Sequence, residues 1–135
     1  MIMLDNTSNS FKYINFLTLA DQAHQEFDFP TLDVHEMKLF ETLVLLTQKT
    51  KACTVSYVVS AVEYSSFSAT HRRLKKLKHV GFVHLITDEL DNRVKYVALT
   101  PMAMSYLDLM GQLLFKAGGG LSFGSLRAGA PILAI

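Results

Sequence analysis

The residues with the clearest chemical capacity are basic side chains gathered in one short stretch of the chain. This cluster consists of Arg72, Arg73, Lys75, Lys76 and Lys78. Cations this close together repel one another, and an anionic partner offsets this repulsion. The phosphate backbone of a nucleic acid is the commonest such partner. The formal net charge of the whole chain is only +1, so an argument for nucleic-acid binding depends on where the charge lies.

The basic cluster lies in a segment whose residue spacing predicts an α-helix over residues 66–79. At about 3.6 residues per turn, one side of this helix carries Phe67, Thr70, Leu74 and Leu77. The opposite side carries Ser68, Ala69, Arg72, Lys76 and His79. One side can therefore pack against a core while the other meets a polar partner. Gly81 suits the left-handed backbone position that follows a helix.

Two strand-like runs follow this glycine and predict a β-hairpin over residues 82–99. Residues 82–86 and 94–99 are rich in β-branched and aromatic residues, and the acidic sequence DELDN lies between them. Such runs separated by turn-forming residues are typical of two antiparallel strands. A basic helix followed by such a hairpin predicts a DNA recognition helix with a β-wing.

Helices are also predicted before and after this region. Their expected positions are residues 11–29, a helix capped by Asp33 with Glu36, a short helix capped by Thr54 or Ser56, and residues 101–116 after Thr100. The first and last helices carry more apolar residues than a small core absorbs, so we expect them to form a dimer interface. The predicted fold class is mainly α with a small β-hairpin wing, a winged helix-turn-helix.

Length and composition predict one domain over residues 1–116, followed by a glycine-rich flexible tail over residues 117–135. The chain has 135 residues, of which 50% are hydrophobic, and this is ample for a core. Cys53 is the one cysteine, which excludes an intrachain disulfide and suits a reducing compartment. Neither a secretory signal nor a transmembrane segment is evident, so we expect a cytoplasmic protein without membrane contact.

The order of helices and wing resembles the MarR (multiple-antibiotic-resistance regulator) family of winged-helix transcription factors. Two motifs carry the resemblance: LKKLKHVGFVHL at residues 74–85, and DELDNRVKYVALT at residues 88–100. In the second motif, Asp88, Asp91 and Arg93 match the acid, acid and arginine of the family's wing. Leu90 departs from the family pattern, which usually has an arginine there. The resemblance covers roughly residues 32–114 and, more weakly, the first helix.

The resemblance implies a homodimer that binds double-stranded DNA and regulates transcription, with a small-molecule effector whose identity the residues do not give. The residues expected to face the major groove are Ser66, Ser68, Ala69, Thr70, His71 and Arg72. Arg72 is the best candidate for a bidentate contact to guanine. Phosphate contacts are expected from Lys75, Lys76 and Lys78. The wing adds Arg93, which could enter the minor groove, and Lys95.

Each functional interpretation has a structural alternative. The basic side of the helix could simply be solvated, and Arg93 with Lys95 could form cross-strand salt bridges to the neighbouring acids. Cys53 could sense oxidants, although a small packed residue is the simpler interpretation. For the whole chain, the alternative function is a winged-helix protein-interaction or dimerisation module without DNA-binding activity.

Enzymatic function finds little support in the sequence. There is no glycine-rich phosphate loop after a strand, and no catalytic set accompanied by a diagnostic local motif. The five histidines have no compact ligand spacing, so we expect neither a metal site nor a cofactor. A binding protein is therefore predicted.

Overall fold

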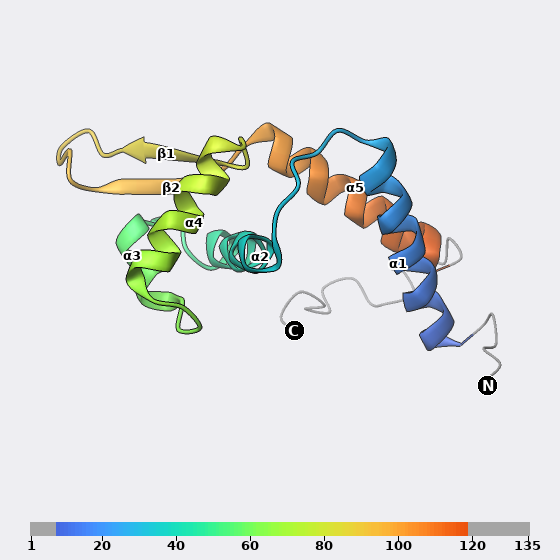
Figure 1. The fold of residues 1–135 in the computed structure, drawn as a ribbon. Helices are drawn as coiled ribbons and strands as arrows, with labels where there is room; N and C mark the ends of the chain where they lie inside the picture. Colours follow the sequence, from blue (N-terminus) through green and yellow to red (C-terminus); the bar gives the residue numbers. More distant parts are fainter. Residues whose placement is uncertain (1–7, 119–135) are drawn as a thin grey trace. The chain divides into compact units, whose positions relative to one another are not determined.

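The computed structural model describes residues 8–118, which form five helices and one two-stranded hairpin (Figure 1). The elements are α1 (Asn9–Glu26), α2 (Val34–Lys49), α3 (Val55–Ala61), α4 (Phe67–His79), β1 (Val83–Thr87), β2 (Lys95–Leu99) and α5 (Pro101–Ala117). This order confirms the predicted fold class, a mainly helical winged helix-turn-helix with a β-hairpin wing.

The chain divides into two compact units. Among the described residues, one consists of residues 8–29 with 106–118, and the other of residues 30–105. The single domain expected over residues 1–116 stays a prediction. The predicted flexible tail lies outside the described residues, apart from Gly118 and from Ala117, which ends α5.

Hydroxyl and carboxylate side chains fix where the helices begin. Asp33 accepts a hydrogen bond of 2.7 Å from the Glu36 N–H, and the Glu36 carboxylate accepts one of 3.0 Å from the Asp33 N–H. This reciprocal pair is the predicted capping box, and it satisfies two amide groups that the helix leaves without partners. Thr54 caps α3 by accepting from the Tyr57 N–H at 3.0 Å, so the valine-rich segment is helical and Thr54, rather than Ser56, is its cap.

The predicted limits of the first helix are wrong at both ends. The helix begins at Asn9 because the Ser8 hydroxyl accepts the Phe11 N–H at 3.1 Å. It ends at Glu26, earlier than the predicted Phe29. Pro30 disfavours a helical conformation in the residue before it, and the chain is already extended at Phe27, with φ −107° and ψ 143°.

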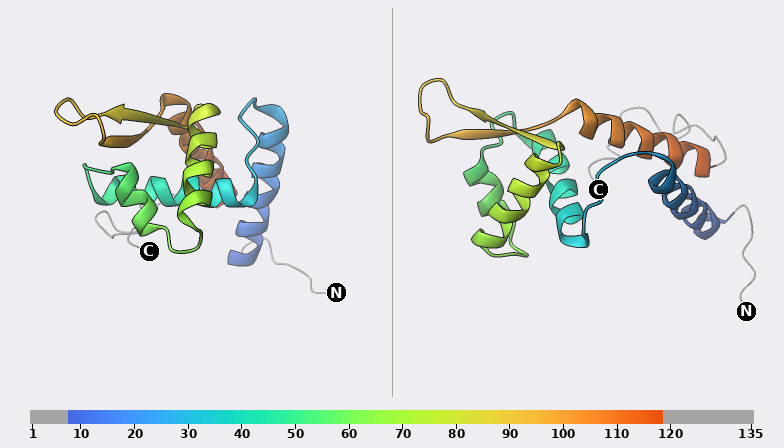
Figure 2. Two further views of the ribbon diagram at one scale, coloured as in Figure 1. Left: turned by 60° about the vertical axis from the view of Figure 1, so that its left-hand side comes forward. Right: turned by 45° about the horizontal axis from the view of Figure 1, so that its top comes forward.

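The unit of residues 30–105 is built around one apolar core. Its largest fully buried side chains are Phe40, Phe82, Leu39, Leu43, Leu77, Val58 and Val83. The rings of Phe40 and Phe82 stack with centroids 4.7 Å apart, and this joins α2 to the chain between α4 and β1. Figures 1 and 2 show α4 crossing α2 in all three views. The core thus fixes the helix that carries the basic cluster.

The wing is an antiparallel hairpin attached to this core at its base. The register pairs Val83 with Leu99 and Thr87 with Lys95, and the base is buried at Val83 and Val97. The Val97 N–H donates to the Cys53 carbonyl oxygen at 2.7 Å, which ties the segment before α3 to β2. In Figures 1 and 2 the hairpin projects past α3. Its tip is therefore free to meet a partner.

Gly81 sets the exit from α4 into the wing. Its φ of +92° is a conformation that glycine adopts without strain, and an added Cβ would lie 2.8 Å from the Met102 side chain. The Thr100 hydroxyl donates to the Gly81 carbonyl oxygen at 2.5 Å and accepts from the Ala103 N–H at 3.1 Å. Thr100 therefore caps α5, as predicted, and also anchors the turn that follows α4.

The unit that contains α1 is described for residues 8–29 and 106–118. Tyr106 packs beside His24 and edge-on to Phe29, with ring centroids 6.0 and 5.3 Å away. Many large apolar side chains of this unit nevertheless remain exposed, namely Tyr13, Ile14, Leu17, Phe27, Leu114 and Phe115.

Candidate nucleic-acid interface

The helix α4 has one buried side, which positions the rest of its surface. Thr70, Leu74 and Leu77 are buried, as the residue spacing predicts. Phe67 was expected on the same side, but this prediction is wrong, because its side chain is 67% exposed. Phe67 is the first residue of the helix, so it lies beyond the point where the core covers this side.

Most of the predicted DNA-facing residues of α4 are accessible. The exposed ones are Ser66, Ser68, His71, Arg72, Lys75, Lys76 and Lys78, and Ala69 is half-buried. Thr70 does not belong to this set, contrary to the prediction. Its side chain is 1% exposed and shares a hydrogen bond of 2.6 Å with the Ser65 hydroxyl. Thr70 therefore holds the start of the helix in place and presents nothing to a partner.

The charge of α4 is uncompensated along the helix. It contains the five basic residues of the cluster and no acidic residue. Within residues 8–118, no ion pair joins any of the five to a carboxylate; the ion pair that this part of the chain does form is in the wing. Exposed cations with no local counterion create a positive potential that attracts anions.

Two residues before α4 fix the turn from which it emerges. Tyr64 lies against α2: its hydroxyl shares a hydrogen bond of 3.1 Å with that of Thr42, and the Lys38 ammonium stands 5.0 Å from its ring centroid. Ser66 then caps α4 by accepting the Ala69 N–H at 3.2 Å. These contacts orient the first turn of the helix with respect to the core.

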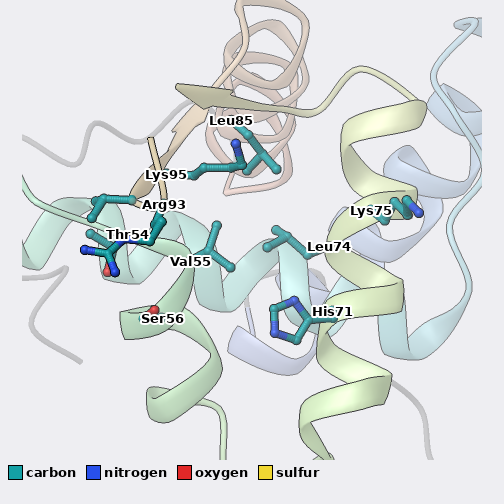
Figure 3. Close-up of a pocket in the computed structure, with 10 residues that line it drawn as sticks. Thr54, Val55, Ser56, His71, Leu74, Lys75, Leu85, Arg93 and Lys95 are labelled. Atoms are coloured by element: carbon teal, nitrogen blue, oxygen red, sulfur yellow. The ribbon is translucent and has the colours of Figure 1, made fainter. Parts of the chain in front are cut away.

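A groove separates α4 from the wing. It has a volume of about 660 Å³ and is lined by Thr54, Val55, Ser56, His71, Leu74, Lys75, Leu85, Arg93, Val94 and Lys95. In Figure 3, His71 and Leu74 extend from α4 toward Val55, and Lys95 lies beside Leu85 on the wing. Leu74, Val55 and Leu85 give the groove apolar walls. Its lining also includes Lys75 of α4, whose side chain extends away from Val55 in Figure 3, and Arg93 and Lys95 from the region of the wing. The structure thus brings four predicted residues together: His71, Lys75, Arg93 and Lys95.

The arginine of the wing is held by a neighbouring acid. Arg93 donates from Nε and Nη2 to the two carboxylate oxygens of Asp91, at 3.1 and 3.2 Å. These hydrogen bonds hold the pKa of Asp91 below its usual value. The Arg93 side chain is 90% exposed, so the pair is screened by water and contributes little to stability. The bridge is local to the turn, rather than the cross-strand bridge that was the alternative to DNA contact.

Asp88 shapes the turn at the wing tip. One carboxylate oxygen accepts the N–H groups of Leu90 and Asp91, both at 3.0 Å, and the other accepts the Tyr96 hydroxyl at 3.1 Å. The hydrogen bond to Asp88 raises the pKa of Tyr96. The turn leaves Leu90 97% exposed at the tip. Asp88 is therefore a structural residue of the wing.

Sequence reasoning missed part of the groove. Val55 and Ser56, at the start of α3, line it together with Thr54, although the sequence suggested only a helix cap there. Their spacing carries no signal for a groove, because it is the bridge between Thr54 and Tyr96 that brings this segment to the wing. A long-range pairing of this kind cannot be read from local periodicity.

Other chemistry has little support in the described residues. Cys53 is buried, and burial raises the pKa of its thiol, which disfavours the reactive thiolate. Within residues 8–118, no three His, Cys, Asp or Glu side chains are placed to hold a metal ion. None of the helices in that range is long and apolar enough to cross a membrane.

Comparison with solved structures identifies the architecture. The chain is similar to the Staphylococcus aureus MepR protein in its complex with DNA, with a TM-score of 0.58 and 18% identity over 87% of this chain and 83% of that one. The chain has a MarR-like winged-helix fold. It is also similar to the heme sensor protein PefR from Streptococcus agalactiae in complex with heme, with a TM-score of 0.51 and 19% identity over 98% and 91% of the two chains.

Comparison of the sequence with family models and with curated proteins finds no match. The MarR-like identification therefore rests on fold, and it agrees with the two motifs noted in the sequence. In this fold, α4 occupies the position of the recognition helix and the β1–β2 hairpin that of the wing.

Proposed function

We propose that the chain is a sequence-specific, double-stranded DNA-binding transcriptional regulator that acts as a homodimer in the cytoplasm. The observation that carries the proposal is the basic cluster of α4, in which Arg72, Lys75, Lys76 and Lys78 are exposed and Arg73 is half-buried. The helix has no acidic residue, and the cluster forms no ion pair among the described residues. A major groove about 12 Å wide admits one helix. The solved complex of MepR with DNA supports the same use of the fold here. The role is binding and not catalysis.

The residues divide by the contact that each is placed to make. At the start of α4, the exposed Ser66, Ser68 and His71 and the half-buried Ala69 face base edges, and Arg72 makes a bidentate contact to guanine. Lys75, Lys76 and Lys78 neutralise phosphates, which fix the position of the protein without reading sequence. Arg93 and Lys95 bring the wing to the adjacent minor groove, and Arg93 exchanges its exposed bond to Asp91 for a contact to DNA.

The dimer is supported by the exposed apolar side chains of α1. Tyr13, Ile14 and Leu17 are exposed over one turn of the helix, a pattern that costs free energy unless a second subunit covers it. A two-fold dimer would present two recognition helices to a pseudo-palindromic site with half-sites about one helical turn apart. The double substitution Ile14→Glu and Leu17→Glu should give a folded monomer in sedimentation, with weaker DNA binding. Unchanged dimerisation would place the interface elsewhere.

Control by a small molecule is part of the same proposal. A ligand that binds one spacing of the two recognition helices better than another would shift the dimer toward that spacing. The heme sensor PefR has a similar fold, but a fold alone does not select the ligand. The effector therefore stays unassigned.

The deciding experiment is binding to a fluorescent pool of random duplex DNA across a salt series. The wild-type protein is compared with an Arg72→Ala, Lys76→Ala double variant. The matched control is a Lys49→Ala, Lys116→Ala variant, which loses the same charge at exposed positions outside α4. We expect salt-dependent binding by the wild type and the control, and its loss in the α4 variant.

The competing function is a winged-helix protein-interaction or dimerisation module. No binding to duplex at low salt by a folded dimer would favour that function. Equal losses in the α4 variant and in the control would also contradict the proposal, because binding would then follow total charge and not the recognition helix.

A further inference from the structure

Phe67 is an exposed aromatic residue at the start of the recognition helix. It follows the cap residue Ser66 and is 67% exposed. Its two neighbours, Ser66 and Ser68, have short side chains, so the ring extends beyond them. Single exposed apolar side chains are common on protein surfaces, so exposure alone does not indicate a role for Phe67, whereas its position on the helix does.

Phe67 lies at the leading end of α4, one turn before the first α4 residue that lines the groove. It precedes His71 by four residues, which places the two side chains on the same side of the helix in successive turns. His71 lines the groove between α4 and the wing. Side chains on a helix lean toward its N-terminus, so the Phe67 ring points toward the end that enters the major groove in this type of docking.

The chemistry of the major groove leaves one kind of apolar partner for such a ring. Base edges there are hydrogen-bond donors and acceptors, except for the C5-methyl group of thymine. Resting on the proposed DNA-binding function, we propose that Phe67 contacts a thymine methyl group in each half-site and so determines specificity for thymine at one position. Arg72 would read guanine by hydrogen bonds, while Phe67 reads thymine by apolar contact.

The test removes the methyl group and the ring separately. A binding site is first selected from random duplex with the wild-type protein, and each thymine of a half-site is then replaced by deoxyuridine, which lacks only the C5-methyl group. The variants are Phe67→Ala, Phe67→Leu and the control Val34→Ala. Val34 is 81% exposed and, like Phe67, is the first residue of a capped helix, but it lies on α2 and not on the proposed recognition helix.

We expect deoxyuridine at one position to weaken wild-type and Val34→Ala binding about fourfold per half-site, the value of one buried methyl-sized group. Phe67→Ala should bind the thymine duplex more weakly and should not distinguish it from the deoxyuridine duplex. Phe67→Leu keeps an apolar side chain and should retain part of the discrimination. Because Phe67 is mostly exposed, circular dichroism and thermal melting should show all variants folded.

Three outcomes would overturn the inference. The same deoxyuridine effect in Phe67→Ala and wild type would assign the methyl contact to another residue. No deoxyuridine effect at any position would mean that no methyl group is read. If Phe67→Ala changes the oligomeric state but leaves the discrimination between thymine and deoxyuridine unchanged, the ring makes a protein contact and not a DNA contact. Failure of the wild-type protein to bind any duplex is a different result, because it contradicts the proposed DNA-binding function itself and not only the role of Phe67.

Discussion

The recognition helix and the wing belong to one unit but differ in how their charge is balanced. Helix α4 has five basic residues and no acidic residue. The wing has three acidic residues, Asp88, Glu89 and Asp91, against two basic ones, Arg93 and Lys95. Arg93 is also bound to Asp91 by two side-chain hydrogen bonds. The helix offers free positive charge, whereas the wing neutralises most of its own.

This difference in charge balance indicates which region should supply the free energy of DNA binding. Each phosphate that a cation neutralises releases condensed counterions and adds to the salt dependence of binding. The helix can do this without breaking an ion pair among the described residues. The wing must first break the Arg93 pair and bring its acids toward a polyanion. We therefore expect the helix to supply most of the affinity for DNA and the wing to contribute a small part of it.

Charge reversal should give the largest effect and test the comparison directly. The double variant Arg72→Glu, Lys76→Glu should lose on the order of a hundredfold or more in affinity, because two attractive contacts become repulsive. The matched wing variant Arg93→Glu, Lys95→Glu should lose about tenfold. Fluorescence anisotropy on the selected duplex at fixed salt measures both. Equal losses would show that the wing contributes as much as the helix.

Truncation of Arg72 should separate reading of sequence from charge. Arg72→Ala should weaken binding to the selected site by ~1–3 kcal/mol if its guanidinium contacts guanine, and should weaken binding to random duplex less. Arg93→Ala should affect the two duplexes alike, because a backbone or minor-groove contact carries less sequence information. The ratio of the two dissociation constants is the measurement. An unchanged ratio for Arg72→Ala would mean that this residue contacts a phosphate and does not read a base.

The helix was also the easier of the two regions to predict from sequence. Its buried side follows from local spacing, and its start and end follow from Ser66 and Gly81, so residues 66–79 were placed correctly. Phe67 was misjudged because spacing gives an angle around the helix but not how far the core extends along it. Thr70 lies on the buried side, as its spacing indicates, so its inclusion among the groove-facing residues was wrong. For Thr70, the bond to Ser65 depends on the fold of the preceding turn.

The groove and the wing depend on contacts that local patterns do not contain. Val55 and Ser56 reach the groove because the chain at Thr54 pairs with Tyr96, more than forty residues later. The sequence likewise does not decide which acidic residue bonds to Arg93, because several acidic residues lie close to it along the chain. In the structure, Asp91 bonds to Arg93. Asp88 instead accepts hydrogen bonds from a backbone N–H of the turn and from the Tyr96 hydroxyl.

Release of Arg93 should strengthen the contribution of the wing. Asp91→Asn removes one negative charge and the carboxylate that holds Arg93, so we expect affinity for duplex to rise about fivefold at low salt. Glu89→Gln is the matched control, because it removes the same charge without touching Arg93. A similar gain in both variants would mean that only net charge matters. A loss in Asp91→Asn alone would show that the Arg93 pair orders the wing for binding.

The pH dependence of this contact should be weak at neutral pH. The pKa of Asp91 is lowered by Arg93, so the carboxylate stays ionised until the pH falls below the usual range of an aspartate. The stabilisation of the turn by this pair is therefore present at neutral pH and is lost only as the pH falls through the lowered pKa. The ratio of the DNA affinities at pH 8 and pH 6 should accordingly be the same in Asp91→Asn and wild type. A difference between them in that range would contradict the assignment.

The smallest expected effect comes from giving the wing tip a positive charge. Leu90 is 97% exposed in a turn held by Asp88, so Leu90→Arg can be made without disturbing the core. An exposed charge of this kind is worth about 0.2–1 kcal/mol, or roughly 1.5- to 5-fold in affinity. The salt dependence should steepen by up to about one released counterion per wing. Leu90→Gln is the neutral control. If Leu90→Arg changes neither affinity nor salt dependence while charge reversal on α4 abolishes binding, the wing tip does not reach the DNA, and recognition rests on the helix alone.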